Sequence, residues 1–177
     1  MESFLKGFLP KVLPDGYVYN QNYFLHPHQG KSDLLKSIPA KIKIDYGETT
    51  VFVILHDQDS NNCIDLKNKI QQICQTNCRD GNRCLVRIVC RELESWYFGD
   101  LDAIEQAFPK FKANKYKNKS KFRNPDSINA ADEMMKILPE FQKNKGAKLL
   151  SQYIDVSNNR SNSFKQFVTG LQRIIMS

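Results

Sequence analysis

Two aspartates follow an apolar run in the first third of the sequence. The segment VFVILHDQD (51–59) places Asp57 and Asp59 two residues apart, after five apolar residues and a histidine. Hard divalent cations such as Mg²⁺ prefer carboxylate oxygens and are typically held by one or two acids together with waters or substrate phosphates. The pair therefore indicates a metal site. The alternative is that Asp59 or Ser60 only caps the following helix while Asp57 is solvated.

A second acidic group follows another apolar run. The segment CLVRIVCRELE (84–94) ends with Arg91, Glu92 and Glu94. Two further carboxylates and a guanidinium beside the aspartates would be enough to bracket two metal ions around a scissile phosphate. The competing interpretation places both glutamates in the first turn of a helix, where the helix dipole favours them, with Trp96 in the core.

If these acids form one site, the chemistry that they indicate is metal-dependent cleavage of a phosphodiester bond. The expected cofactor is Mg²⁺ or Mn²⁺, and its expected ligands are Asp57, Asp59 and Glu94. The residues expected to transfer protons or to stabilise charge on the phosphate are Glu92, Glu94 and Lys143.

The elements that must position these acids are predicted to form an α/β sheet. Residues 51–55 and 84–90 have the composition of fully buried strands, and residues 62–74 carry apolar side chains at helical spacing. A strand–helix–strand order predicts two parallel strands whose carboxyl ends meet at one edge, where open α/β sheets bind ligands. We expect one domain over residues 1–177, with a core over about 1–108 and a basic loop and helical C-terminal part over about 109–177.

The remaining segments are predicted to be mostly helical. Residues 2–13 are expected to form a short helix, and the aromatic-rich segment 17–24 a strand. Ser32 or Asp33 is expected to cap a helix of one or two turns that ends near Pro39. Asp100 and Ser127 are expected to cap two further helices. The segments predicted to be helical in the second half are 92–108, 127–141, 146–154 and 161–176.

A basic segment accounts for the whole net charge of +7. The stretch KFKANKYKNKSKFR (110–123) contains seven basic residues and no acid. Lysines can follow a phosphate backbone, and the interleaved Phe111, Tyr116 and Phe122 could stack on bases. The other interpretation is a solvated loop whose lysines keep the protein soluble. On the first interpretation nucleic acid is a partner, and its expected contacts are Lys31, Arg91, Lys115, Lys117, Lys119, Lys121 and Arg123.

The overall composition is that of an ordinary globular protein. No apolar run approaches the ~18 residues of a membrane span, and the N-terminus MESFLKGFLP lacks the features of a signal peptide. We therefore expect a cytoplasmic protein that does not bind a membrane. Of the five cysteines, Cys74 and Cys78 could share a helical face as zinc ligands, but reduced and mostly buried thiols are the favoured interpretation.

Several segments together resemble a bacterial family, domain-of-unknown-function family 4276. The most specific are HDQDS (56–60) and CLVRIVCRELESWYFGDLDAI (84–104), supported by HQGKSDL, FRNPDSI, FQKNKGAKLL and NRSNSFKQFVTGL. Members of this family look like compact Toprim domains. The resemblance implies a parallel sheet flanked by helices, an Asp-x-Asp pair that binds Mg²⁺ or Mn²⁺, and nuclease activity. It also implies a partner ATPase of the ABC or AAA kind and a role in anti-phage defence.

One part of the Toprim pattern has no counterpart in this sequence. Toprim domains carry a catalytic glutamate after their first strand, and the family pattern places this strand before the helix at ESFLKGFLP. The chain begins inside that helix, and Glu2 lies a few residues too late to match. Two hypotheses follow: a nuclease whose true start codon lies upstream of Met1, or a catalytically inactive module that binds nucleic acid or a protein. An unrelated α/β domain with coincidental acids is the third.

Overall fold

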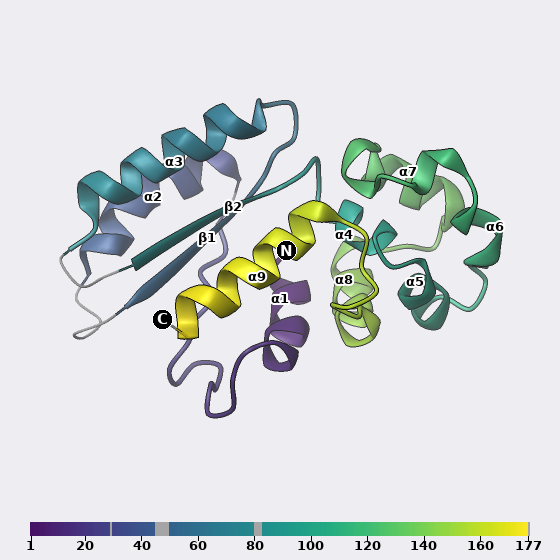
Figure 1. Ribbon diagram of the computed structural model, residues 1–177, viewed down its shortest axis with the longest axis horizontal. Coiled ribbons are helices and arrows are strands. Elements are labelled where there is room, and N and C mark those ends of the chain that lie inside the picture. The colour runs from purple at the N-terminus through teal and green to yellow at the C-terminus, as the bar shows by residue number, and fades with distance from the viewer. Residues whose placement is uncertain (29, 45–49, 80–82, 177) are drawn as a thin grey trace.

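The computed structural model describes residues 1–28, 30–44, 50–79 and 83–176. Figure 1 shows an elongated molecule, with a small sheet and its covering helices at one end and a group of short helices at the other. The α/β fold class expected from the sequence is confirmed, with a parallel sheet flanked by helices and a helical C-terminal part.

The sheet consists of two parallel strands among the described residues. Strand β1 (Val51–Asp57) pairs with β2 (Arg83–Val89), from Val51 opposite Arg83 to Asp57 opposite Val89. The connection is α3 (Cys63–Asn77), which begins where the Asn62 side chain accepts hydrogen bonds from the backbone N–H groups of Ile64 and Asp65. The predicted strand–helix–strand unit is therefore confirmed, and the carboxyl ends of both strands lie at one edge.

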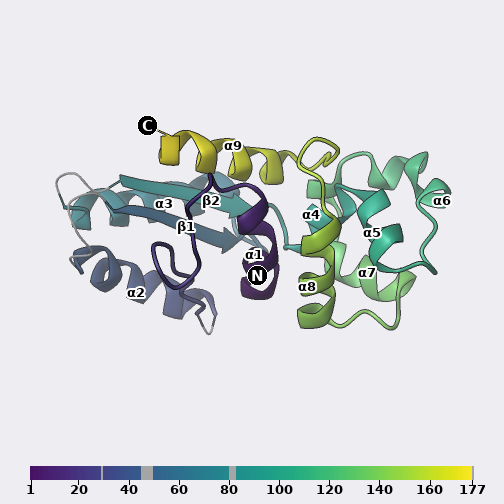
Figure 2. The same cartoon turned by 90° about the horizontal axis from the view of Figure 1, so that it is seen from below.

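Helices cover both faces of the sheet because side chains alternate between the faces along each strand. Helix α3 and α2 (Lys31–Lys43) lie on one face, and α9 (Asn162–Met176) runs along the other (Figures 1 and 2). On the α3 side, Val86 and Ile88 of β2 pack with residues such as Ile38, Ile42 and Ile70. We call this the α3-side core; it also contains Cys74 and contacts Cys78 and Cys84.

A larger core links the other face of the sheet with the rest of the chain. It extends from Phe4 to Leu171 and includes Leu85 and Val89 of β2. Trp96 of this core is fully buried and stacks on Phe167, with ring centroids 5.2 Å apart. The helices that contribute to this core or adjoin it are α1 (Glu2–Phe8), α4 (Glu94–Phe98), α5 (Leu101–Ala107), α6 (Asn114–Lys117), α7 (Ala130–Ile137) and α8 (Lys143–Tyr153). Short 3₁₀ turns occur at Leu9–Lys11, Ser120–Phe122 and Pro125–Ser127.

Two predictions about the N-terminal part are wrong. The segment 17–24 contains only an isolated bridge between Tyr19 and Tyr23, because Asn20 takes a left-handed φ of 64° and turns the chain. The helix expected to end near Pro39 continues through it to Lys43. Ile38 and Ile42 are buried in the α3-side core on either side of the proline, and their burial offsets the hydrogen bond that Pro39 cannot donate.

The two predicted helix caps of the second half have different outcomes. The Asp100 carboxylate accepts a hydrogen bond from the Ala103 N–H at 3.1 Å, as expected. The prediction for Ser127 is wrong, because α7 begins at Ala130 and the Ser127 hydroxyl donates to the Asn124 carbonyl instead. Among the helices described, none has both the length and the apolar character that crossing a membrane would require.

Candidate functional site

The backbone beyond the ends of β1 and β2 holds two acidic loops together. The Gln58 N–H donates to the Val89 carbonyl at 2.8 Å, and the Asp59 N–H donates to the Arg91 carbonyl at 3.0 Å. The Gln58 side chain in turn accepts a hydrogen bond from the Arg91 N–H at 3.0 Å. The pairing of the strands is thus extended into the loops, and the acids that follow each strand are fixed relative to one another.

Asp59 and Arg91 both have left-handed backbone conformations, with φ of 52° and 60°. This region is unfavourable for side chains larger than glycine, although aspartate tolerates it better than arginine. Such conformations persist where the surrounding structure imposes them, and they concentrate at functional sites. Here they occur at facing positions in the two acidic loops.

Asp57 is the acid that the surrounding structure perturbs most clearly. Its carboxyl group is largely buried, and its Oδ1 atom has no hydrogen-bond partner among the described residues. Burial raises the pKa of Asp57 to about 6, with a further increase from the charge of Asp59. The N-terminal ammonium group opposes this shift, and Glu94 and Glu92 add smaller increases. The four acids predicted from the sequence therefore lie close enough to interact electrostatically.

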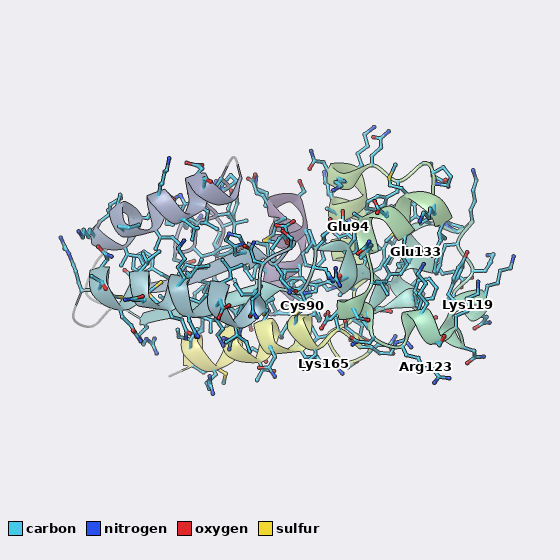
Figure 3. The ribbon with its side chains drawn as sticks, turned by 90° about the horizontal axis from the view of Figure 1, so that it is seen from above. Cys90, Glu94, Lys119, Arg123, Glu133 and Lys165 are labelled. Atoms are coloured by element: carbon cyan, nitrogen blue, oxygen red, sulfur yellow. The ribbon has the colours of Figure 1, made fainter. Side chains whose placement is uncertain are left out.

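Glu94 and Lys143 come together from separate helices. Glu94 is the first residue of α4 and is only 6% exposed, and Figure 3 shows it where the sheet meets the helical part. The Nζ atom of Lys143, at the start of α8, lies 3.9 Å from Glu94 Oε1, and its side chain is 70% exposed. The structure thus brings the predicted Lys143 to the acidic edge.

Glu92 has a structural role as well as its place at this edge. Its Oε2 atom accepts a hydrogen bond from the Ala131 N–H at 3.0 Å, in the first turn of α7. The interpretation that placed the glutamates at helix starts, with Trp96 in the core, therefore applies in part: Glu94 begins α4, and Glu92 caps a different helix.

Tyr97 belongs to the same group of side chains and is not among the site residues expected from the sequence. The residue is 1% exposed, and its hydroxyl group has no hydrogen-bond partner among the described residues. Burial raises its pKa well above the usual value, and the charges of Glu94 and Asp57 add to the shift. Its position three residues after Glu94 in a predicted helix is the signal that could have placed both side chains on one helix face.

Two adjoining hollows lie beside the acidic loops, and of the four acids Asp59 and Glu92 line them. The smaller, of about 350 Å³, is lined by Asp59, Ser60, Arg91, Glu92, Asn129 and Asp132. The larger, of about 590 Å³, shares Asn129 and Asp132 with it and extends to Lys121, Arg123 and Lys136. The end of the basic segment thus lies along the same depression as the acidic loops.

Most of the basic segment has a structural role. Phe111 and Phe122 are buried, and Tyr116 stacks on Phe111 at 4.7 Å, so the two buried rings cannot stack on bases. Lys117 forms an ion pair with Asp102 at 2.7 Å, and Lys119 lies over the Tyr116 ring.

The residues predicted to contact nucleic acid have different surroundings. Lys121 pairs with Glu133, and Lys119 lies far from Glu94 at the outer end of the helical part (Figure 3). Lys115 and Arg123 are exposed, and of these two only Arg123 lines the larger hollow. The side chain of Lys31 lies outside the described residues.

One family model matches nearly the whole chain. The sequence model of a family described as Domain of unknown function (DUF4276) matches residues 1–172. The chain belongs to this family. No curated protein and no solved structure matches it. The residues that match the DUF4276 model include both acidic loops and the neighbouring helical part. The description of the family does not name an activity.

Three of the sequence segments that resemble the family contain residues that stabilise the helical part away from the acids: FRNPDSI, FQKNKGAKLL and NRSNSFKQFVTGL. Asp126 accepts hydrogen bonds from the Ser161 hydroxyl at 2.6 Å and from the Ser163 N–H at 2.8 Å. The Ser163 hydroxyl also accepts the indole N–H of Trp96 at 2.9 Å. A Cβ atom on Gly146 would lie 2.1 Å from the Phe141 ring, so the close approach requires glycine. These motif residues stabilise the fold and do not form part of the acidic site.

The acids fit a divalent cation that is bound through one or two carboxylates and keeps several of its waters. Among the described residues, no group of three or more His, Cys, Asp or Glu side chains is arranged to hold a metal ion. Mg²⁺ is usually bound through one or two carboxylates and keeps several waters. The orphaned Oδ1 of Asp57, beside further carboxylates, fits this type of site.

Proposed function

We propose that this protein is a metal-dependent enzyme that cleaves phosphodiester bonds in nucleic acid at the carboxyl edge of its sheet. The observation that carries the proposal is the environment of Asp57: a largely buried carboxyl group with an unpartnered oxygen, surrounded by other acids and with a pKa of about 6. Burial and like charges both disfavour the ionised form, and a bound cation would favour it. Perturbed acids are typical of functional sites, and Asp59 and Glu92, whose charges raise the pKa of Asp57, line the smaller hollow.

Asp57 and Asp59 are the proposed ligands of Mg²⁺ or Mn²⁺, with Glu94 beside them. A cation bound there would supply Lewis-acid stabilisation of a phosphoryl oxygen and a lowered pKa for a bound water. Glu94 is the better candidate than Glu92 for accepting a proton, since Glu92 Oε2 already binds the Ala131 N–H. Lys143 is exposed and near Glu94, so its ammonium group is suited to stabilise charge on the phosphate.

Nucleic acid is the proposed substrate because basic side chains line the larger hollow, which adjoins the smaller hollow at the acidic loops. Arg123 and Lys136 line the larger hollow, and Arg91 lines the smaller hollow next to Glu92. The smaller hollow is itself rich in acids, so a phosphate would approach it only with a cation present. On the family resemblance we also propose a partner ATPase and a role in phage defence.

A second candidate is a module that binds nucleic acid or a protein without cleaving it. The observation that favours it is that no group of three or more potential ligands, among the residues described, is arranged to hold a metal. In such a module the hollows and Arg123 would bind the partner without cleaving it. The acids would then only stabilise the local structure, as Glu92 does by accepting a hydrogen bond at the start of α7.

Incubation with labelled single-stranded DNA, RNA and plasmid in the presence of Mn²⁺ separates the two candidates. We expect the wild-type chain to cleave at least one substrate and Asp57→Asn to lose the activity. Asp65→Asn, on the exposed side of α3, is the matched control and should cleave normally. Equal cleavage by wild type and Asp57→Asn would reject the site, whereas binding without cleavage by all three proteins would support the second candidate.

A further inference from the structure

Three of the five cysteines meet where α3 ends and β2 begins. The sulfur atoms of Cys78 and Cys84 are 3.4 Å apart, and both residues are half-buried. Cys74, one helical turn before Cys78, is buried, and the nearby Cys84 thiol lowers its pKa. All three lie in or against the α3-side core, away from the acidic edge.

The arrangement favours pairing of two sulfurs over binding of a metal. No group of three or more His, Cys, Asp or Glu side chains in the described part of the chain is arranged to hold a metal ion. A disulfide needs a sulfur–sulfur distance of about 2.05 Å, which two side chains already in contact can reach with small rotations. Cys78 follows the last residue of α3 and has an extended backbone, so the helix does not have to distort.

We propose that Cys78 and Cys84 are an oxidative modification site, at which a peroxide converts the two thiols reversibly into a disulfide. This inference does not depend on the proposed function. The thiolate of Cys78 attacks the peroxide O–O bond, which gives a sulfenic acid and releases hydroxide. The sulfur of Cys84 then attacks that of Cys78, the S–S bond forms, and water leaves. The peroxide is thus reduced to two waters, and the two thiols lose two protons and two electrons.

Cys84 supplies the proton of the second step. The nearby Cys74 thiol and burial both raise the pKa of Cys84, so this sulfur keeps its proton until it attacks. As the S–S bond forms, that proton passes to the departing hydroxide, which leaves as water.

The proposed bond would connect the end of α3 to the start of β2. Position 84 lies near the amino end of β2, whereas the acids follow its carboxyl end, so oxidation would leave the acidic loops in place. A disulfide here would restrict the unfolded chain, and we expect the midpoint of thermal unfolding to rise on oxidation and to return with a reductant.

Peptide mapping of the full-length chain tests the proposal. After treatment with hydrogen peroxide and blocking of free thiols, tryptic digestion should give a peptide 70–79 linked to 84–87, and the number of free thiols should fall from five to three. Reductant should restore five.

Serine variants identify the partner of Cys84. Cys78→Ser should abolish the linked peptide, whereas Cys74→Ser should still form it. Cys63→Ser, elsewhere on α3, is the matched control and should fall from four free thiols to two. A linked peptide that persists in Cys78→Ser, a link between other cysteines, or five free thiols after treatment of the wild type would each overturn the proposal.

Discussion

The backbone N–H of Asp59 donates a hydrogen bond of 3.0 Å to the carbonyl oxygen of Arg91, and both residues have positive φ. This bond joins the two loops that carry the acids, one after each strand. Because Gln58 also bonds the Arg91 N–H, the loops are held by both backbone and side-chain contacts. The acidic site is therefore positioned by the ends of the strands, independently of any ligand.

The left-handed conformation of Arg91 predicts opposite effects of two substitutions. Arg91→Gly should leave the free energy of unfolding unchanged or raise it slightly, because glycine adopts positive φ without steric cost. Arg91→Val should lower it by about 1–2 kcal/mol, because a β-branched side chain is most strained there. Urea denaturation of both variants measures the difference. Equal stability of the two would show that position 91 is not held in this conformation in solution.

The raised pKa of Asp57 predicts that stability depends on pH. Between the ordinary aspartate value near 4 and the folded value of about 6, the folded state holds a proton that the unfolded state has released. The free energy of unfolding should therefore decrease as pH rises through this window, by at most about 3 kcal/mol, and then level off.

Asp57→Asn removes this titration, since asparagine does not ionise. Denaturation of both proteins at pH 4.5, 5.5 and 7 should show the variant gaining stability relative to wild type as pH rises. Parallel pH profiles of the two proteins would contradict the assignment.

Tyr97→Phe removes the hydroxyl group and keeps the ring, so it measures the contribution of the hydroxyl alone. The hydroxyl is buried without a described partner, so its removal should leave the free energy of unfolding unchanged or raise it by about 1 kcal/mol. If the hydroxyl contacts a bound water or phosphate beside Glu94, cleavage should slow at least tenfold, in kcat more than in KM. A large loss of stability would instead indicate a structural hydrogen bond.

Arg123→Ala should weaken binding of single-stranded DNA, because Arg123 lines the larger hollow. We expect the slope of log affinity against log salt to fall by about 1. Lys119→Ala is the matched control, since Lys119 packs over Tyr116 at the outer end of the helical part. Fluorescence anisotropy at several salt concentrations measures both. A larger loss of DNA affinity in Lys119→Ala than in Arg123→Ala would show that the binding surface lies away from the hollows.

The parts predicted correctly from the sequence are those set by local pattern. The two buried strands and the helix between them have clear periodicity, and their order fixes which ends meet, so Asp57 and Glu94 could be placed at one edge. The helix through Pro39 could not be predicted, since its length depends on burial of Ile38 and Ile42 against distant residues.

The same limit applies to side chains whose roles depend on long-range contacts. Phe111 and Phe122 look available for stacking in a basic segment, and only the folded chain shows that other helices bury them. The contact between Cys78 and Cys84 joins the end of α3 to the start of β2, and no spacing rule for cysteine pairs indicates it. The Tyr97 hydroxyl becomes notable only because it is buried without a partner.

The most direct test of the acidic site is the binding of Mn²⁺, followed by electron paramagnetic resonance of the free ion. At pH 7 the wild-type chain should bind Mn²⁺, and Asp57→Asn should bind it at least tenfold more weakly, a loss of about 1.4 kcal/mol. At pH 5, where Asp57 is mostly protonated, wild-type binding should weaken towards that of the variant. Mn²⁺ binding of equal strength by wild type and Asp57→Asn at pH 7, or no binding by either, would contradict the account.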